Sequence, residues 1–478
     1  MHPFRIACLD KLNWRSGAYA LVLLCATTAI PLPAQTFTTL HSFDATDGDD
    51  PQGGLVQATN GKLYGTTYGG GANGAGTVFK ITPSGTLTTV YSFCAQSGCS
   101  DGAYPYATLV QATNGSLYGT TTGGGASGDG TVFKITPGGV LTTLHSFDVT
   151  DGYLPYTALV QASNGDLYGT TVQGGANGAG TVFKITPSGT LTTLYSFCSQ
   201  SACTDGKSPF SALVQATNGN LYGTTFVGGA DGYGTVFKIT PSGTLTIVHS
   251  FDYTNGGNPE AGLVEASDGN LYGTTEDGGG TDSGTVFKIT PSGTLTTLYS
   301  LCSQSNCADG YDVTAALVQA TDRSFYGTTV LGGANCIPDG GCGTIFKITP
   351  GGALTTLYNF TGGTDGENPE TGLTQDTNGK FYGTTQAGNG TIYSLSVGLG
   401  SFVETQTSSG KVGAVVKILG TDLTGATSVT FNGTAATFTI VSKSEITTTV
   451  PTGATTGPVK VVTPGGTLTS NFNFRVTP

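Results

Sequence analysis

The cysteines are the residues of this chain whose type and spacing most directly suggest chemistry. Ten occur in 478 residues, and eight of them form four close pairs. The pairs are Cys94–Cys99, Cys198–Cys203, Cys302–Cys307 and Cys336–Cys342. Cysteines paired locally and in even number predict disulfides in an exported chain. The alternative is a four-thiolate zinc site, which only the last two pairs are placed to form. We predict disulfides and no metal site.

Two other sets of titratable residues recur along the sequence. His41, His145 and His249 are equally spaced, and equivalent positions elsewhere carry tyrosine, as at Tyr91. This exchange of histidine for tyrosine indicates packing rather than catalysis. The second set consists of one aspartate or asparagine per repeat. Calcium binding is one interpretation of this set, but its residues do not have the Asp-x-Asp-x-Asp-Gly spacing of calcium loops. We predict instead that these side chains satisfy the backbone of their own turns, because each precedes a glycine. The set comprises Asp47, Asp101, Asp151, Asp205, Asn255, Asp309 and Asp365.

Tyrosines and acids also gather in the stretches where the repeats differ from one another. Tyrosine rings stack on sugars or pack against peptides, and carboxylates fix hydroxyl groups. The residues that we assign to ligand binding on this basis are Tyr68, Tyr104, Tyr106, Tyr153, Tyr156, Tyr311, Glu276, Asp277, Asp312 and Glu370. Ordinary solvated loops are the alternative. The sequence has no tryptophan after Trp14, which weakens the sugar interpretation.

The elements that must position these residues repeat seven times. Each unit contains a Leu-Tyr-Gly-Thr-Thr run, as at 63–67, and a Gly-Thr-Val-Phe-Lys-Ile run, as at 76–81. Four short β-branched or aromatic runs, separated by tight turns such as Asn-Gly, predict one four-stranded antiparallel sheet per unit. In the first unit we expect strands at 55–58, 62–67, 77–82 and 86–93. Seven such sheets predict an all-β fold with a seven-bladed β-propeller. A linear β-solenoid is the alternative, but these units are too long for its rungs.

The two ends of the repeated region are complementary. The strand expected at 36–43 has no earlier strand in its unit, and the last unit has no fourth strand after 391–396. We therefore predict that these two segments pair and close the ring, since both edges would otherwise be exposed. In such a ring, the loops between the fourth and first strands and between the second and third strands share one face. This long-loop face carries the variable residues named above, and loops on a rigid scaffold often carry function.

Both parts of the chain resemble known families. The motifs Leu-Val-x-Ala, Asn-Gly-x-Leu-Tyr-Gly-Thr-Thr, Gly-Gly-x4-Gly-Thr-Val-Phe-Lys-Ile and Leu-His-Ser-Phe resemble those of the GloVer tandem-repeat proteins, across Phe37 to Leu395. That resemblance implies a secreted bacterial protein and no particular activity. Strand-like segments separated by glycines predict a small β-sandwich at 401–478. It resembles an IPT/TIG immunoglobulin-like domain through the spacing of Gly413, Val416, Ile418 and Gly420.

The N-terminus and the net charge restrict location and partners. Basic Arg5, Lys11 and Arg15 precede an apolar run at 18–30, and Ala34 offers a cleavage site, as in a secretory signal. No later apolar run is long enough to span a membrane, so no transmembrane segment is expected in the mature chain. The formal net charge of −12 argues against nucleic acid as a partner.

We therefore expect a signal peptide at 1–34, a propeller at 35–396, a linker at 397–400 and an IPT/TIG-like domain at 401–478. The predicted function is a secreted or cell-surface, non-enzymatic binding or adhesion module. Its partner would be an extracellular glycan or protein on the long-loop face, and no cofactor is expected. The first alternative is an extracellular carbohydrate-active enzyme, a lyase or glycosidase. The near-identity of the blades is against it, because an active site needs unlike polar residues at one place. The second alternative is a purely structural surface protein.

Overall fold

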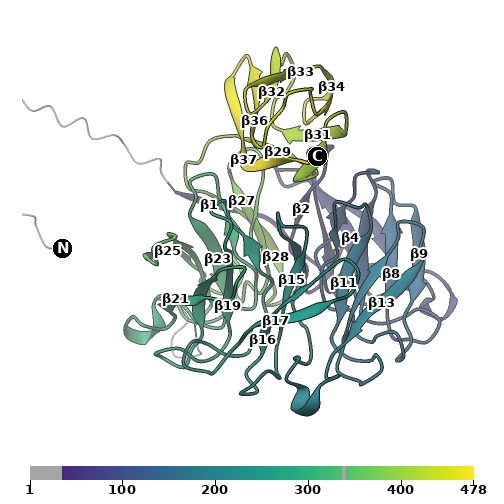
Figure 1. Ribbon diagram of the computed structural model, residues 1–478, viewed down its shortest axis with the longest axis vertical. Coiled ribbons are helices and arrows are strands. Elements are labelled where there is room, and N and C mark those ends of the chain that lie inside the picture. The colour runs from purple at the N-terminus through teal and green to yellow at the C-terminus, as the bar shows by residue number, and fades with distance from the viewer. Residues whose placement is uncertain (1–34, 336–340, 478) are drawn as a thin grey trace, which may run out of the picture.

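The computed structural model describes residues 35–335 and 341–477, which form an all-β protein in two parts (Figure 1). The predicted signal peptide at 1–34 lies outside the described residues. The helical segments within the described ranges are the short 3-10 turns η1 (Ser97–Cys99), η2 (Ser201–Cys203) and η3 (Ser305–Cys307). In this part of the chain no helix is long and apolar enough to cross a membrane.

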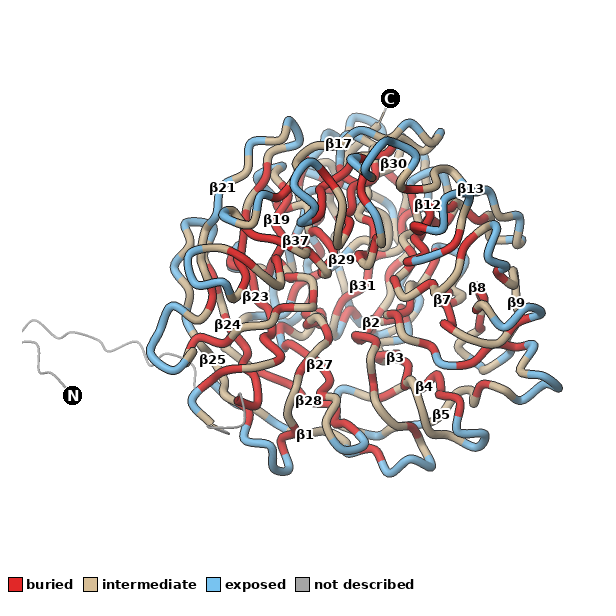
Figure 2. The backbone as a smooth tube through the Cα atoms, turned by 90° about the horizontal axis from the view of Figure 1, so that it is seen from below, coloured by how far each residue is buried: buried red, intermediate tan, exposed pale blue. Residues whose placement is uncertain are grey.

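Seven four-stranded antiparallel sheets surround a common axis (Figure 2), and the propeller prediction is confirmed. Blade one consists of β2 (Val56–Gln57), β3 (Leu63–Thr67), β4 (Thr77–Ile81) and β5 (Leu87–Ser92), each within one residue of the expected ends. Blade two consists of β6 (Val110–Gln111), β7 (Leu117–Thr121), β8 (Thr131–Ile135) and β9 (Leu141–Ser146). Blade three consists of β10 (Val160–Gln161), β11 (Leu167–Thr171), β12 (Thr181–Ile185) and β13 (Leu191–Ser196). Blade four consists of β14 (Val214–Gln215), β15 (Leu221–Thr225), β16 (Thr235–Ile239) and β17 (Leu245–Ser250). Blades five and six contain β18 (Val264–Glu265), β19 (Leu271–Thr275), β20 (Thr285–Ile289) and β21 (Leu295–Ser300), then β22 (Val318–Gln319), β23 (Phe325–Thr329), β24 (Thr344–Ile348) and β25 (Leu354–Asn359).

Blade seven is completed by the first strand of the described chain. Its strands β26 (Thr374–Gln375), β27 (Phe381–Thr385) and β28 (Thr391–Ser396) are followed in the sheet by β1 (Thr36–Ser42). The antiparallel register joins Thr36 to Ser396 and Ser42 to Thr391, so the predicted closure of the ring is confirmed. Figure 2 shows β1 beside β28 at the rim of the ring.

The repeated Leu-Tyr-Gly-Thr-Thr strand is buried along its whole length because blades pack on both sides of it. At Gly65 a Cβ atom would lie 2.5 Å from Cζ of Phe79, so this strand needs glycine for close approach. The Asn60-Gly61 turn before this strand is held by hydrogen bonds of the Asn60 side chain. Asn60 donates its Nδ2 hydrogen to Tyr64 Oη at 2.9 Å and accepts one from the Lys62 backbone at 3.1 Å. The recurring motif is therefore explained by packing and turn formation.

The C-terminal part is a nine-stranded sheet that wraps around one apolar core. Two halves of this sheet are joined by a single parallel pair, Val403 with Ser470. Val416 and Ile418 from one half meet Phe431 and Val461 from the other in the core. The strands are β29 (Val403–Thr405), β30 (Ser409–Lys411), β31 (Val415–Gly420), β32 (Ser428–Phe431), β33 (Thr434–Ala436), β34 (Phe438–Ser442), β35 (Glu445–Thr449), β36 (Gly457–Thr463) and β37 (Gly466–Thr477).

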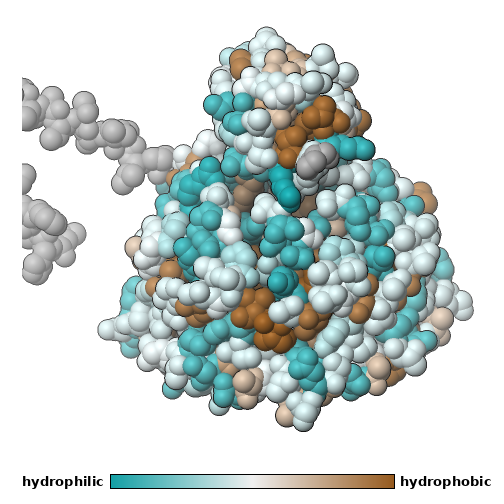
Figure 3. Space-filling view, viewed as in Figure 1, coloured by the Kyte–Doolittle hydropathy of each residue, from teal (hydrophilic) through white to brown (hydrophobic). Residues whose placement is uncertain are grey.

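The C-terminal part sits on the face of the propeller that carries the tight turns (Figure 1). Ser444 Oγ donates a hydrogen bond to Thr59 O at 2.8 Å, and Asn471 Nδ2 donates one to Gln319 O at 2.7 Å. A cleft of about 640 Å³ remains between the two parts beside β14 and β18. Figure 3 shows that the surface is hollowed where the C-terminal part meets the propeller. The opposite, long-loop face of the propeller is left uncovered.

Candidate binding site

A pocket of about 410 Å³ lies on the propeller axis at the long-loop face. Every blade contributes one residue to the pocket wall, the residue that directly follows the proline of the loop before its first strand. In blade six a valine takes the place of this proline. These residues are Gln52, Tyr106, Tyr156, Phe210, Glu260, Thr314 and Glu370. One position, repeated around the ring, therefore sets much of the chemistry of this axial pocket.

The loops that present these residues are held in place by backbone pairing. In blade two, Ala103 exchanges two hydrogen bonds, of 2.9 and 3.0 Å, with Gly123 of the loop between β7 and β8. Gly102, just before it, has a φ of +98°, and a Cβ atom there would lie 2.6 Å from Thr121 Oγ1. Only glycine fits this turn, which directs the chain back toward the axis.

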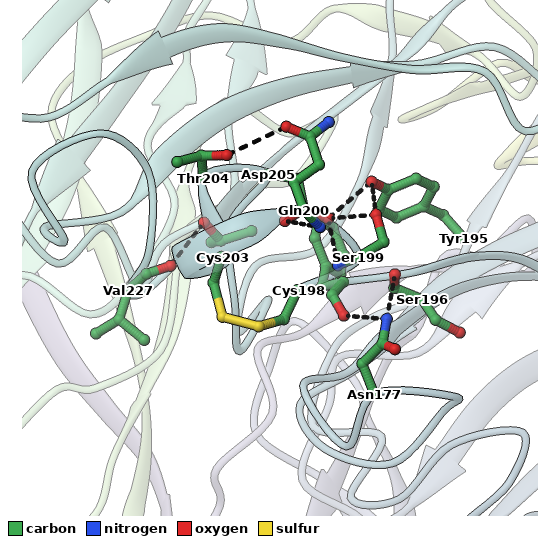
Figure 4. The surroundings of a disulfide bond; sticks show 12 residues. Asn177, Tyr195, Ser196, Cys198, Ser199, Gln200, Cys203, Thr204, Asp205 and Val227 are labelled. Carbon is green, nitrogen blue, oxygen red and sulfur yellow. Dashed lines mark hydrogen bonds between the residues drawn. A yellow bond between two sulfur atoms is a disulfide. The ribbon is translucent and has the colours of Figure 1, made fainter.

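Six of the seven loops carry an aspartate before that glycine, and Asp205 shows how it anchors the loop. Asp205 is fully buried, and its Oδ2 accepts hydrogen bonds from Tyr195 Oη at 2.7 Å and from Ser199 N at 2.9 Å (Figure 4). Gln200 N donates to Oδ1 at 3.3 Å. Burial alone would raise the pKa of Asp205, but these hydrogen bonds outweigh it and the pKa is lowered. The backbone contacts agree with the predicted turn role, and the tyrosine contact adds a link to the preceding strand.

Histidine replaces this tyrosine before three of the loops. His41 Nε2 lies 2.7 Å from Asp47 Oδ2, and His145 Nε2 lies 2.7 Å from Asp151 Oδ2. In the third case the turn residue is Asn255, and burial lowers the pKa of His249. His41 and His145 thus act as loop anchors, in agreement with a packing role, whereas His249 Nε2 is buried without a hydrogen-bond partner among the described residues.

Three of the predicted disulfides are present: Cys94–Cys99, Cys198–Cys203 and Cys302–Cys307. Cys336 lies outside the described residues, so its pairing with Cys342 stays a prediction. The alternative of a four-thiolate zinc site is wrong, because Cys302 and Cys307 are bonded to each other. Within the described residues, no three His, Cys, Asp or Glu side chains are grouped closely enough to hold a metal ion.

Blades one to four give the axial pocket an aromatic side. Ring centroids are 4.7 Å apart for Tyr106 and Tyr156 and 5.5 Å apart for Phe210 and Phe226. The ring planes are 88° apart for Tyr106 and Tyr156 and 30° apart for Tyr156 and Phe210. This aromatic arc consists of Tyr68, Tyr104, Tyr106, Tyr156, Phe210 and Phe226.

Blades five to seven give the pocket an acidic side, the acidic arc of Glu260, Glu276, Asp312 and Glu370. None of these four side chains forms a hydrogen bond or an ion pair within the described part of the chain. Burial, followed by the charges of nearby carboxylates, raises the pKa of each of the three glutamates to about 7. The same causes raise the pKa of Asp312.

The structure brings half of the predicted ligand-binding residues to the pocket wall. Those that line it are Tyr106, Tyr156, Glu276, Asp312 and Glu370. Tyr68 and Tyr104 belong to the aromatic arc behind the wall. Tyr153, Tyr311 and Asp277 instead pair through their backbones with the neighbouring loops and are not part of the wall. Phe210 and Gln52 were missed, and Glu260, although it belongs to the variable long-loop face, was not assigned to ligand binding. Their shared place after the loop proline was a usable signal.

A comparison with models of protein families identifies the family to which the repeats belong. A model of the Gloeobacter/Verrucomicrobia repeat matches residues 27–163, 155–337 and 217–440, which include all the blades. The chain belongs to the Gloeobacter/Verrucomicrobia repeat family. The expected GloVer relationship is thereby confirmed. No curated protein matches the sequence.

Solved structures similar to this Gloeobacter/Verrucomicrobia repeat protein support the fold. One is a domain described as the extracellular part of a hybrid two-component system of Bacteroides thetaiotaomicron, with 12% identity and a TM-score of 0.50. The match covers 88% of this chain and 52% of that domain, so this chain spans about half of its length. Another is a fungal alcohol oxidase in complex with copper, with 12% identity, a TM-score of 0.52 and coverage of 93% of this chain and 99% of the oxidase.

Proposed function

We propose that the chain is an extracellular, non-enzymatic binding module whose ligand, a glycan or a protein, occupies the axial pocket. The observation that carries this proposal is the division of the pocket into an aromatic arc and an acidic arc. Such a wall offers apolar contact area together with a few polar groups, the usual composition of a ligand site. The disulfides suit an oxidising compartment. A similar fold occurs in a domain described as extracellular.

The same proposal assigns roles to the remaining segments. Residues 1–34 are a signal peptide for export, and 397–400 are a linker. Residues 401–478 are an immunoglobulin-like domain of the IPT/TIG type. Because this domain lies on the turn side, it leaves the axial pocket open to a partner and is free to hold the module at a surface.

The proposal is tested with residues 35–478 on a glycan array and on a panel of extracellular proteins. We expect at least one ligand whose binding is weakened about tenfold by Tyr106→Ala and by Tyr156→Ala, since each removes a wall of the pocket. Tyr233→Ala is the matched control, because Tyr233 is an exposed tyrosine outside the pocket wall. Ligands that bind all four proteins equally, or no ligand at all, would contradict the proposal.

An extracellular lyase or glycosidase is the second candidate, and one observation favours it. Three glutamates with a pKa near 7 in one pocket have the acid strength that general acids need at neutral pH. Polysaccharide cleavage by residues 35–478 that is lost in Glu260→Gln or Glu370→Gln would establish this alternative. Without such cleavage, the binding module is the better description.

A further inference from the structure

The acidic arc is a concentration of carboxyl groups without a counter-ion from the described residues. Glu260, Glu276, Asp312 and Glu370 come from three successive blades, so their charges are spread along the wall rather than gathered at one point. Burial and then the charges of Glu276, Asp312 and Glu370 raise the pKa of Glu260. Asp277 adds to the field at Glu276, and Asp50 adds to that at Glu370.

A further polar group of the pocket is left without a partner. Gln52 lines the pocket between the two arcs, and its Nε2 donates a hydrogen bond to Asp50 Oδ1 at 2.9 Å. Its Oε1, by contrast, is buried and has no hydrogen-bond partner among the described residues. A buried acceptor without a partner costs free energy, and a donor from a ligand would remove that cost after a rotation of the Gln52 side chain toward the pocket. The carboxyl groups of the acidic arc are therefore the groups that call for a cationic donor.

The aromatic arc decides which kind of cationic ligand fits best. Sugars stack on a broad, flat ring face, but the three rings of the pocket wall do not share one plane, with 88° between Tyr106 and Tyr156 and 30° between Tyr156 and Phe210. Mixed ring edges and faces suit a narrow, flexible alkyl stem instead. Arginine and lysine have such stems, and their charged ends gain from aromatic faces as well as from carboxylates.

We propose that the axial pocket receives an arginine or lysine side chain from a basic segment of a partner protein. This inference rests on the proposed binding function and names its ligand class. The stem of the side chain lies against the aromatic arc, and its charged end faces the acidic arc and Gln52. The net charge of −12 steers positively charged partners toward the protein as a whole.

The test uses residues 35–478 and fluorescent twelve-residue peptides of alternating glycine and arginine, with a citrulline peptide of the same length as the neutral control. We expect the arginine peptide to bind at least about tenfold more tightly than the citrulline peptide in 20 mM salt, with the difference shrinking in 500 mM salt. The double variant Glu260→Gln with Glu370→Gln should lose about tenfold in affinity. Asp231→Asn with Asp282→Asn, which neutralises two exposed acids outside the pocket wall, is the control for net charge and should bind as the parent does.

A chitosan oligosaccharide and its N-acetylated form serve as the sugar arms of the same experiment. Pocket-dependent binding of chitosan without binding of the arginine peptide would overturn the peptide inference in favour of an amino sugar, and the proposed binding function would stand. Tyr106-dependent binding of neutral sugars alone would also overturn it and leave that function intact. Equal loss of peptide binding in both double variants would show attraction to overall charge only. Failure of every probe in this experiment and in the array would remove both proposals.

Discussion

In six of the seven long loops, an aspartate before a glycine helps to fix where the loop lies. In blade four's loop, the buried Asp205 holds the outer strand through Tyr195 and the loop backbone through Ser199 and Gln200. Removing a buried acceptor leaves these donors unsatisfied, which is more costly than losing the hydrogen bonds alone. Because Phe210 follows a few residues later, the anchor also bears on the shape of the pocket wall.

We expect Asp205→Ala to lower the free energy of unfolding by about 2 kcal/mol for this reason. Equilibrium denaturation followed by tyrosine fluorescence measures the change. Asp231→Ala, an exposed aspartate on the same face, should stay within about 0.5 kcal/mol of the parent. Equal stability of the two variants would show that the anchor is not structurally important.

At the scale of elements, β1 is the strand on which the ring depends. Its Phe37 stacks on Tyr358 of blade six, with ring centroids 3.9 Å apart, and also contacts Tyr393 of β28 at 5.2 Å. β1 therefore joins blade seven internally and ties it to its neighbour.

Phe37→Ala should lower the free energy of unfolding by about 2–3 kcal/mol, because a half-buried stacked ring is removed from the closing strand. Protease cleavage within 35–43 should become faster at the same time, which reports release of β1 itself. The control is Thr38→Ala, whose side chain is exposed on the same strand. If stability fell while β1 remained as resistant as in the parent, the effect would be local packing rather than ring closure.

The sequence predicted these elements well because each depends on local chemistry. The Asn60-Gly61 turn, the buried 63–67 strand and the unmatched strand at 36–43 all follow from residue type and order. The pocket wall could be predicted only in part, because radial position within a ring is set by how seven loops converge. Tyr153 and Tyr156 are three residues apart in one loop, yet only Tyr156 lines the pocket. Aligning the loops on their proline would have identified the wall residue of each loop, and would have added Phe210 and Glu260 to the predicted site.

At the scale of the whole molecule, the acidic arc makes stability depend on pH. The pKa values of Glu260, Glu276 and Glu370 are raised to about 7 in the folded protein, from ordinary values of 4.5. Between these pH values the folded protein binds more protons than the unfolded chain. The free energy of unfolding therefore falls as pH rises from about 4.5 to about 7, and these groups add no further change above that.

We expect the melting temperature of residues 35–478 to be lower at pH 8 than at pH 5.5 in scanning calorimetry. Glu260→Gln with Glu370→Gln should reduce this difference, since two of the groups that titrate in this range are gone. Part of it should remain, because the buried Asp376, whose pKa is raised to about 6 by burial, also titrates in this range. Asp231→Asn with Asp282→Asn should leave the difference as in the parent. A parent protein that melts at the same temperature at both pH values would contradict the assignment.

The way in which the ring closes also has a consequence for how the chain reaches its fold. β1 is made first and β28 last among the propeller strands, so the edge of β1 waits for its partner while every other blade is assembled. Until then nothing distinguishes the β28 of its own chain from that of another copy. Refolding at high protein concentration should therefore yield dimers that have exchanged β1, whereas dilute refolding yields monomers, and size-exclusion chromatography separates the two. The concentration at which the chain folds thus helps to determine whether a ring is closed from within or by a second molecule.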